Sequence, residues 1–317
     1  MILLQVENLH ISFNTPRGES RTLRGVDFTV DSGSIFGIVG ESGCGKSLTG
    51  KAILGLVPYP GKITDGRILF NGEDLRAKSE RERRQLRGNQ IGMIFQDPGA
   101  ALNPVFTIEQ QMLAVMQRHR PESKKALRTR ALALIEDVGL PHPPRILSSY
   151  PHELSGGMQQ RVMIAMSLAL EAELLIADEP TTALDVTIQA QILDLLVKLR
   201  EEKGVTIILI THDMGVVAET CDEMAVFYAG RVVERGRAND IFQSPKHPYT
   251  QGLWAAIPHT NSRGHDLKVI PGSVPSGLAI SQGCAFADRC DHVMGICHEV
   301  EPPFVTFERG HEAMCHL

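Results

Sequence analysis

The residues best suited to chemistry in this sequence form a short glycine-rich segment near its N-terminus. Residues 40–47 read GESGCGKS and fit the pattern G-x-x-x-x-G-K-[ST]. The apolar run SIFGIVG precedes the segment and LTGKAILGL follows it, which predicts a buried strand before the loop and a helix after it. This flanking pattern distinguishes a phosphate-binding loop, or P-loop, from a chance glycine-rich turn.

Such a loop binds phosphate mainly through its backbone. Glycines let the chain wrap closely around the anion, and N–H groups of the loop and of the helix N-terminus then donate to it. We expect Lys46 to contact the β- and γ-phosphates of a nucleoside triphosphate and the Ser47 hydroxyl to ligate Mg²⁺. No side-chain role is assigned to the residue between the loop's second and third glycines, because its position in the pattern is variable. The predicted nucleotide-binding residues are Gly40, Glu41, Ser42, Gly43, Cys44, Gly45, Lys46, Ser47 and Leu48.

Two carboxylates at the end of an apolar run form the second chemical group. Residues 174–179 read LLIADE, and ligands of wound α/β sheets bind at the carboxyl ends of the buried strands. We expect Asp178 to hold Mg²⁺ through water, and Glu179 to be the general base that polarises the attacking water. The alternative is that one of the two acids only caps the following turn.

The elements that must position these groups alternate between strands and helices. Alternation of apolar and polar residues with frequent turns predicts partly antiparallel strands in the first 75 residues. An apolar stripe that ends before Gly204 predicts a helix over residues 187–203. Continuous apolar runs predict further buried strands at residues 91–96, 174–179, 206–213 and 224–230.

This order of elements predicts an α/β fold with a mostly parallel wound sheet and an antiparallel β subdomain. Residues 97–173 look helical, which predicts a helical subdomain inserted into the α/β core. After residue 243 the pattern becomes rich in turns, and we interpret it as a linker followed by a small extension. The predicted domains are therefore residues 1–243 and residues 244–317.

Composition restricts the class of protein and its location. The 317 residues are 43% hydrophobic and 22% charged, as in ordinary globular proteins, and the net charge of -5 argues against a nucleic-acid partner. The N-terminus lacks the pattern of a signal peptide, and no uncharged apolar run reaches the ~20 residues that span a bilayer. We therefore expect a cytoplasmic chain that contacts a membrane only through a partner.

Cysteines gather near the C-terminus. Four of the six lie after residue 283, with the spacing C-x₅-C-x₆-C-x₁₇-C, and in a cytosolic chain such a group favours a metal site over disulfides. Structural zinc sites prefer closely spaced C-x₂₋₄-C pairs and ferredoxins have other spacings, so spacing alone leaves the metal open. The remaining alternative is four buried thiols without metal. The predicted ligands are Cys284, Cys290, Cys297 and Cys315.

A third motif connects the first two to a known family. Residues 154–159 read LSGGMQ and precede the helical pattern QRVMIAMSLAL, and this string resembles the LSGGQ signature of the ATP-binding cassette family. Met158 stands where the family has glutamine, a mild departure because the phosphate contacts come from a serine hydroxyl and backbone N–H groups at a helix N-terminus. The resemblance implies that these residues act on the ATP of a partner subunit: Leu154, Ser155, Gly156, Gly157, Met158 and Gln159.

The same resemblance assigns roles to residues outside the three motifs. Gln96 matches the family's Q-loop, which senses Mg²⁺, and His212 matches the switch histidine that contacts the γ-phosphate. Phe13 lies where the family stacks an aromatic ring on adenine, although a phenylalanine on an edge strand is as often a core residue. The D-loop is implied at Thr182, Ala183, Leu184 and Asp185.

Longer strings narrow the resemblance to the ATPase subunits of bacterial dipeptide and oligopeptide importers. They include ESGCGKS, IFQDPGAALNP, ADEPTTALDVTIQAQI, IFQSPKHPYTQGLWAAIP and GCAFADRC, and they cover nearly the whole chain. The resemblance implies two membrane permease subunits, a sister or identical ATPase subunit, an extracytoplasmic binding protein, and the cofactors ATP and Mg²⁺. Relatives that import nickel, glutathione or antimicrobial peptides leave the solute open. Some members carry an iron–sulfur cluster on a similar cysteine-rich tail, which implies [4Fe–4S] here.

Other cassette proteins fit the sequence less well. Ribosome-associated members carry two cassettes in one chain, and exporters usually fuse their own membrane spans. DNA-repair members need a long coiled-coil insertion between P-loop and signature, for which residues 48–154 are too few. A purely regulatory role is disfavoured because every hydrolytic residue is present.

Overall fold

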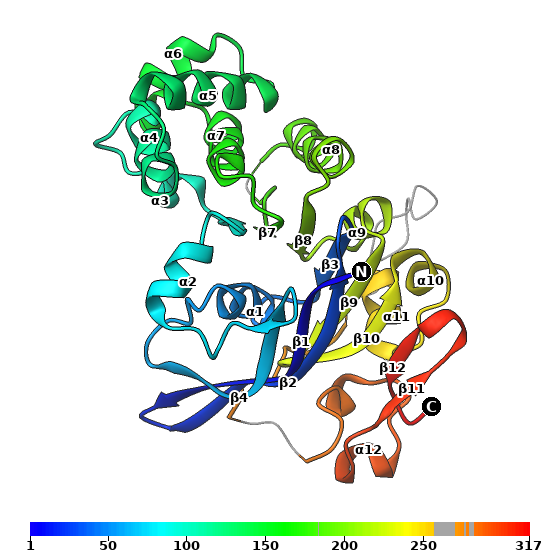
Figure 1. The fold of residues 1–317 in the computed structure, drawn as a ribbon. Helices are drawn as coiled ribbons and strands as arrows, with labels where there is room; N and C mark the ends of the chain where they lie inside the picture. Colours follow the sequence, from blue (N-terminus) through cyan, green and yellow to red (C-terminus); the bar gives the residue numbers. More distant parts are fainter. Residues whose placement is uncertain (183, 257–269, 276, 279–281) are drawn as a thin grey trace. The chain divides into compact units, whose positions relative to one another are not determined.

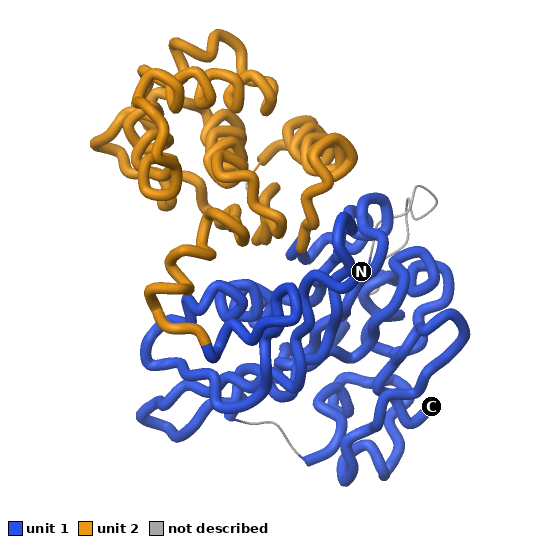
Figure 2. The backbone as a smooth tube through the Cα atoms, viewed as in Figure 1, with its two compact units in different colours: residues 1–77, 209–317 blue, residues 78–208 orange. Residues whose placement is uncertain are grey.

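The computed structural model describes residues 1–182, 184–256, 270–275, 277–278 and 282–317. The chain forms two compact units, which are coloured separately in Figure 2. Unit 1 contains residues 1–77 and 209–317, and unit 2 contains residues 78–208. Unit 2 includes more residues than the helical subdomain predicted at 97–173. It also contains the helices at 80–86 and 186–203, the strands at 91–94 and 174–178, and the start of the strand at 206–211.

An antiparallel sheet forms the N-terminal part of unit 1. Strand β1 (Ile2–Thr15) pairs with β2 (Gly18–Asp31) on one side and with β4 (Gly61–Phe70) on the other, and β4 also pairs with β5 (Glu73–Asp74). Apolar side chains along β1 are buried, as the alternation in the sequence predicts. The antiparallel β subdomain is thus confirmed.

The second sheet of unit 1 surrounds the strand that leads to the P-loop. Its strands lie in the order β11 (Phe304–Thr306), β12 (Glu312–Met314), β10 (Arg231–Arg237), β9 (Glu223–Tyr228) and β3 (Ile35–Val39) (Figure 1). Strand β3 is fully buried and pairs in parallel with β9, whereas the pairs β9–β10, β10–β12 and β12–β11 are antiparallel. Strand β8 (Thr206–Thr211) spans the boundary between the units, because unit 2 ends at Ile208 and unit 1 resumes at Leu209.

Helices of unit 1 follow the strands that carry candidate residues. Helix α1 (Lys46–Ile53) begins directly after the P-loop glycines, and α9 (Met214–Thr220) begins two residues after His212. The remaining helices are α10 Ala238–Gln243, α11 Pro248–Ala255 and α12 Gly295–Glu299.

The first residues after 243, where the sequence predicts a linker, pack against the core of unit 1. Tyr249 of α11 is fully buried, and its ring lies 4.6 Å from that of Tyr228 and 5.4 Å from that of Phe286. The buried carboxylate of Glu234 on β10 accepts hydrogen bonds from the N–H groups of Lys246 (2.7 Å) and His247 (3.0 Å). Residues 244–317 are here called the C-terminal region. Because β12 also pairs with β10, the described part of this region continues the core and sheet of unit 1.

Unit 2 combines a parallel strand pair with helices. Strand β6 (Ile91–Ile94) pairs in parallel with β7 (Leu174–Asp178), and β6 is shorter than the predicted strand at 91–96. Helix α8 (Val186–Lys203) confirms the helix predicted at 187–203 and ends at Gly204, whose φ is +66°. The other helices are α2 Glu80–Leu86, α3 Pro98–Ala101, α4 Ile108–His119, α5 Lys124–Asp137, α6 Pro143–Ser148 and α7 Gly156–Leu168.

Within the described residues, every helix is too short or too polar to cross a lipid bilayer.

Candidate functional site

The P-loop of unit 1 has the strand–loop–helix geometry that its sequence predicts. The loop begins where β3 ends at Val39, and helix α1 starts at Lys46. Gly40 has a φ of +147°, and a Cβ atom there would collide with the carbonyl oxygen of Phe227. Gly45 has a φ of +106° and also leaves no room for a side chain, so the first and last glycines of the pattern are sterically required.

Lys46 is placed inside the curve of this loop. Its side chain is buried, and Nζ donates hydrogen bonds to the carbonyl oxygens of Gly40 (2.7 Å) and Glu41 (3.0 Å). Ser47 and Leu48 lie in the first turn of α1, half-buried. The charge of Lys46 and the positive end of the α1 dipole, which starts at the same residue, both favour phosphate oxygens.

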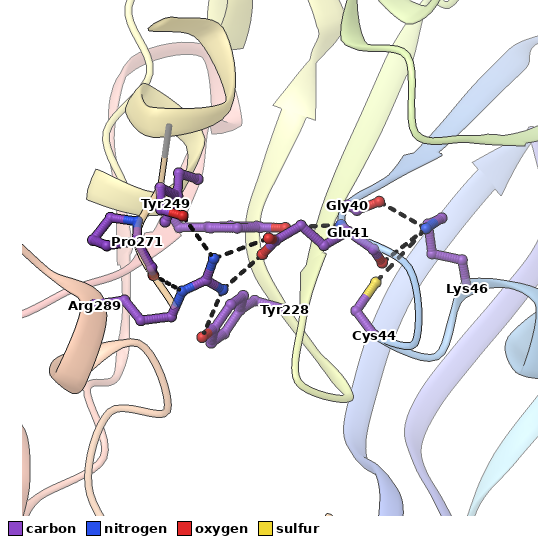
Figure 3. A network of polar contacts seen from close by, with 9 residues as sticks. Gly40, Glu41, Cys44, Lys46, Tyr228, Tyr249, Pro271 and Arg289 are labelled. Carbon is purple, nitrogen blue, oxygen red and sulfur yellow. Dashed lines mark hydrogen bonds and ion pairs between the residues drawn. The ribbon is translucent and has the colours of Figure 1, made fainter. Parts of the chain in front are cut away.

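Cys44 contacts the rest of the loop through both its thiol, which accepts from Lys46 Nζ at 4.0 Å (Figure 3), and its backbone. The side chain is fully buried, and burial raises the pKa of the thiol, which therefore stays protonated at neutral pH. Its carbonyl oxygen accepts a hydrogen bond from Gly230, which ties the loop to the turn between β9 and β10.

Unit 2 brings the predicted base together with the Q-loop glutamine. Asp178 ends β7 and is buried, and Glu179 follows with a φ of +47°, which non-glycine residues rarely adopt. The Gln96 amide and the Thr182 hydroxyl each donate to Oε2 of Glu179 at 2.9 Å. Two donors on one oxygen fix the direction of the carboxylate, which a general base needs.

The signature residues form the start of helix α7 in unit 2. Ser155 is the N-cap, and its hydroxyl accepts a hydrogen bond from the N–H group of Met158. The Gln159 side chain turns back and donates to the carbonyl oxygens of Pro151 (2.9 Å) and Leu154 (3.1 Å). Gln159 therefore braces the segment before the helix, while Gly156 and Gly157 present backbone at the positive end of the helix dipole.

The remaining predicted residues occupy loops and strand ends. His212 is exposed directly after β8, and Phe13 is half-buried on β1, where its ring packs over Gly61. Asp185 caps helix α8, because its carboxylate accepts a hydrogen bond from the N–H group of Ile188 (3.0 Å). Ala183 of the predicted D-loop lies outside the described residues.

Three side chains contact the candidate base or the P-loop in ways that the sequence did not indicate. The Thr182 hydroxyl bonds the candidate base, and Tyr249 and Arg289 of the C-terminal region bond Glu41 of the P-loop. A hydroxyl three residues after Glu179 could have been found from its spacing. The two C-terminal residues had no local signal, since more than 200 positions separate them from the loop.

The four C-terminal cysteines face one small cavity. Cys284, Cys290, Cys297 and Cys315 line a space of about 20 Å³, enough for roughly one water molecule. Burial raises the pKa of the Cys284 and Cys290 thiols. Within the ranges that the structure describes, however, no three or more Cys, His, Asp or Glu side chains are arranged to hold a metal ion, so the predicted metal site has no geometric support.

Comparison with known proteins agrees with the P-loop, the acids at the end of β7 and the signature at the start of α7. Residues 23–182 match the ABC transporter family, and residues 233–297 match the C-terminal region of the oligopeptide/dipeptide transporter family. A dimeric bacterial ABC transporter cassette superposes with a TM-score of 0.67 at 29% identity, covering 75% of this chain and 99% of that one. The post-hydrolysis state of that cassette, with ADP and Pi bound, gives a TM-score of 0.66 at 28% identity and the same coverage.

Relatives of similar length match almost the entire chain. The dipeptide transport ATP-binding protein DppD of Bacillus subtilis is 49% identical, over 99% of this chain and 94% of that protein. The oligopeptide transport ATP-binding protein OppD of Bacillus subtilis is 50% identical, over 98% and 87%, and DppD of Escherichia coli is 45% identical, over 100% and 97%. The chain therefore belongs to the ABC transporter family, as an ATPase subunit of the oligopeptide/dipeptide transporter type.

Proposed function

We propose that this chain hydrolyses ATP to drive the import of dipeptides or oligopeptides across the cytoplasmic membrane. The observation that carries the proposal is the oriented carboxylate of Glu179, together with a P-loop and a helix-capping signature in one chain. The transport role rests on the names of relatives that match over nearly the full length. Importers of nickel, glutathione or antimicrobial peptides would use the same ATPase cycle with another solute.

Hydrolysis requires two ATPase subunits in a head-to-tail pair. The P-loop lies in unit 1 and the signature in unit 2, and the related cassette that superposes with this chain is dimeric. In the pair, Lys46 and Ser47 of one subunit hold the phosphates and Mg²⁺, while Ser155 and the α7 N-terminus of the other face the γ-phosphate. ATP then stabilises the closed pair and hydrolysis releases it, a two-state change that partner subunits can use.

The partners follow from this role. Two permease subunits would form the membrane pathway, an extracytoplasmic binding protein would deliver the solute, and the second ATPase would be an identical or sister chain. The present chain would bind at the inner face of the membrane through the permeases. Affinity purification of the intact complex, followed by mass spectrometry, tests this composition. Recovery of ribosomes or DNA in place of permeases would contradict the transport role.

Replacing Lys46 by alanine tests the nucleotide site. We expect the affinity of the full chain for ATP to fall about 10- to 100-fold, because charge-assisted hydrogen bonds contribute about 1.5–3 kcal/mol. Equilibrium binding of a fluorescent ATP analogue measures the change. Lys51→Ala, on the same helix, is the matched control and should bind ATP like the wild type. Unchanged binding by Lys46→Ala would contradict the placement of the phosphates.

We also propose that the four C-terminal cysteines bind a [4Fe–4S] cluster. All four line one cavity, and a set of four thiols suits soft metal centres such as iron–sulfur clusters or zinc. The cavity holds about one water, so the thiols would have to move apart to admit a cluster. The cluster would brace a segment that is rich in turns and has little core of its own.

Anaerobic purification of the full chain tests the cluster. We expect brown protein with about four irons per chain, as four thiolate ligands imply. Cys290→Ser should lose most of the iron, whereas Cys221→Ser, which changes a cysteine outside this cavity, should retain it. Colourless protein with stoichiometric zinc, or with four titratable thiols, would exclude the cluster.

A further inference from the structure

An arginine of the C-terminal region forms an ion pair with the P-loop. The Arg289 guanidinium donates to both carboxylate oxygens of Glu41, to Oε2 at 2.8 Å and to Oε1 at 2.9 Å (Figure 3). Its side chain is only 6% exposed, whereas that of Glu41 is 31% exposed. Such a bidentate pair fixes the direction as well as the distance of the carboxylate. Glu41, the second residue of the P-loop, is thus held by a side chain that lies 248 residues later in the sequence.

Arg289 is itself held in place. Its Nε donates to the carbonyl oxygen of Pro271 at 2.7 Å, and one terminal nitrogen lies 3.3 Å from the hydroxyl of Tyr228. The rings of Tyr228 and Phe286 lie within 6 Å of the guanidinium carbon, at 5.7 Å and 5.9 Å. The bonds with Glu41 raise the pKa of Arg289, so its charge persists at every physiological pH.

The main chain of Glu41 is fixed from two further directions. Its N–H group donates to the Tyr249 hydroxyl at 2.9 Å, and its carbonyl oxygen accepts a hydrogen bond from Lys46 at 3.0 Å. Figure 3 shows Glu41 between Arg289 on one side and Lys46 on the other. The C-terminal region therefore supplies two of the side chains that hold Glu41, and the third is the predicted phosphate ligand.

We propose that Arg289 and Tyr249 are positioning residues that hold the P-loop in its phosphate-binding shape. The inference rests on the proposed ATP site. Gly40, Gly43 and Gly45 all have positive φ, and glycines sample many other conformations when nothing restrains them. Apparent affinity falls in proportion to the fraction of molecules whose site is correctly formed. The affinity for ATP therefore depends on two side chains that lie more than 200 positions after the P-loop in the sequence.

The test measures ATP binding by the full chain. We expect Arg289→Ala to weaken the binding of an ATP analogue about tenfold, and Tyr249→Phe, which removes only a hydroxyl, about threefold. Arg289→Lys, which keeps the charge, should recover part of the loss. In the assembled complex, Arg289→Ala should raise KM for ATP more than it lowers kcat.

Arg235→Ala is the matched control. Arg235 of β10 forms an ion pair of 2.6 Å with Glu312 of the C-terminal region, and its side-chain hydrogen bonds go to Glu312 and Asp27, outside the P-loop. It should bind ATP within twofold of the wild type. Equal losses in Arg235→Ala and Arg289→Ala would overturn the inference, because they would reflect general destabilisation.

A double-mutant cycle separates the specific contact from the proposed function. Arg289→Ala and Glu41→Ala should be strongly non-additive, since each removes the same pair. Tyr249→Phe tests the contact on its own if Arg289→Ala does not fold. Binding within twofold of the wild type in Arg289→Ala or, in its place, Tyr249→Phe would overturn only this inference. Failure of the wild-type chain to bind ATP would overturn the proposed function and this inference with it.

Discussion

The variant Glu179→Gln should bind ATP like the wild type but hydrolyse it about 10²–10⁴-fold more slowly, the usual cost of losing a general base. Glutamine keeps an oxygen that can accept the hydrogen bonds from Gln96 and Thr182, so the local geometry should persist. What it lacks is a carboxylate able to take the proton of the attacking water. Steady-state ATPase activity of the assembled complex measures the loss.

The control for this variant lies at the other end of the same strand. Glu173 is exposed directly before β7, so Glu173→Gln removes a carboxylate without touching the site. Its ATPase rate should match that of the wild type. A rate within twofold of the wild type in Glu179→Gln would contradict the assignment of the base.

Ser155→Arg should lower hydrolysis about 10²–10³-fold at the ATP held by the opposite subunit, the usual cost of removing a preorganised donor at a developing charge. The change removes the N-cap of α7 and places a bulky side chain at the helix N-terminus. Nucleotide binding to the variant's own P-loop should persist. A complex that combines one Ser155→Arg subunit with one Lys46→Ala subunit would separate the two sites.

Ser148→Arg provides the comparison, because Ser148 is an exposed serine at the end of α6 in the same unit. It should hydrolyse ATP at the wild-type rate. If Ser155→Arg abolished ATP binding to the isolated chain, the shared-site arrangement would be wrong.

The parts of the site that sequence predicts are those built from neighbouring residues. The P-loop is a local motif whose glycines are required by backbone geometry, and α8 follows from a regular apolar stripe and Gly204. The two acids at the end of β7 are visible because polar groups at the end of a buried strand are unusual. The roles of His212, Phe13 and Asp185 in nucleotide chemistry stay predictions.

The contacts that sequence does not predict join distant segments. Residues after 243 look like a linker because they are rich in turns, yet tertiary contacts bury Tyr249 completely. Strands β11 and β12 have three residues each, too few to show a period. The ion pair between Arg289 and Glu41 leaves no periodic trace in either segment. Cysteine spacing likewise suggests a common site without specifying the arrangement of its thiols.

The ion pair between Glu41 and Arg289 also sets an order in time. The P-loop is synthesised early in translation. At ~5–20 residues per second, the 248 positions from Glu41 to Arg289 take roughly 12–50 s to synthesise. Throughout that interval the nascent chain carries a complete P-loop sequence without the arginine that fixes it. If Arg289 positions the P-loop as proposed, tight nucleotide binding is deferred until translation is nearly finished, and an interrupted chain would compete poorly for cellular ATP.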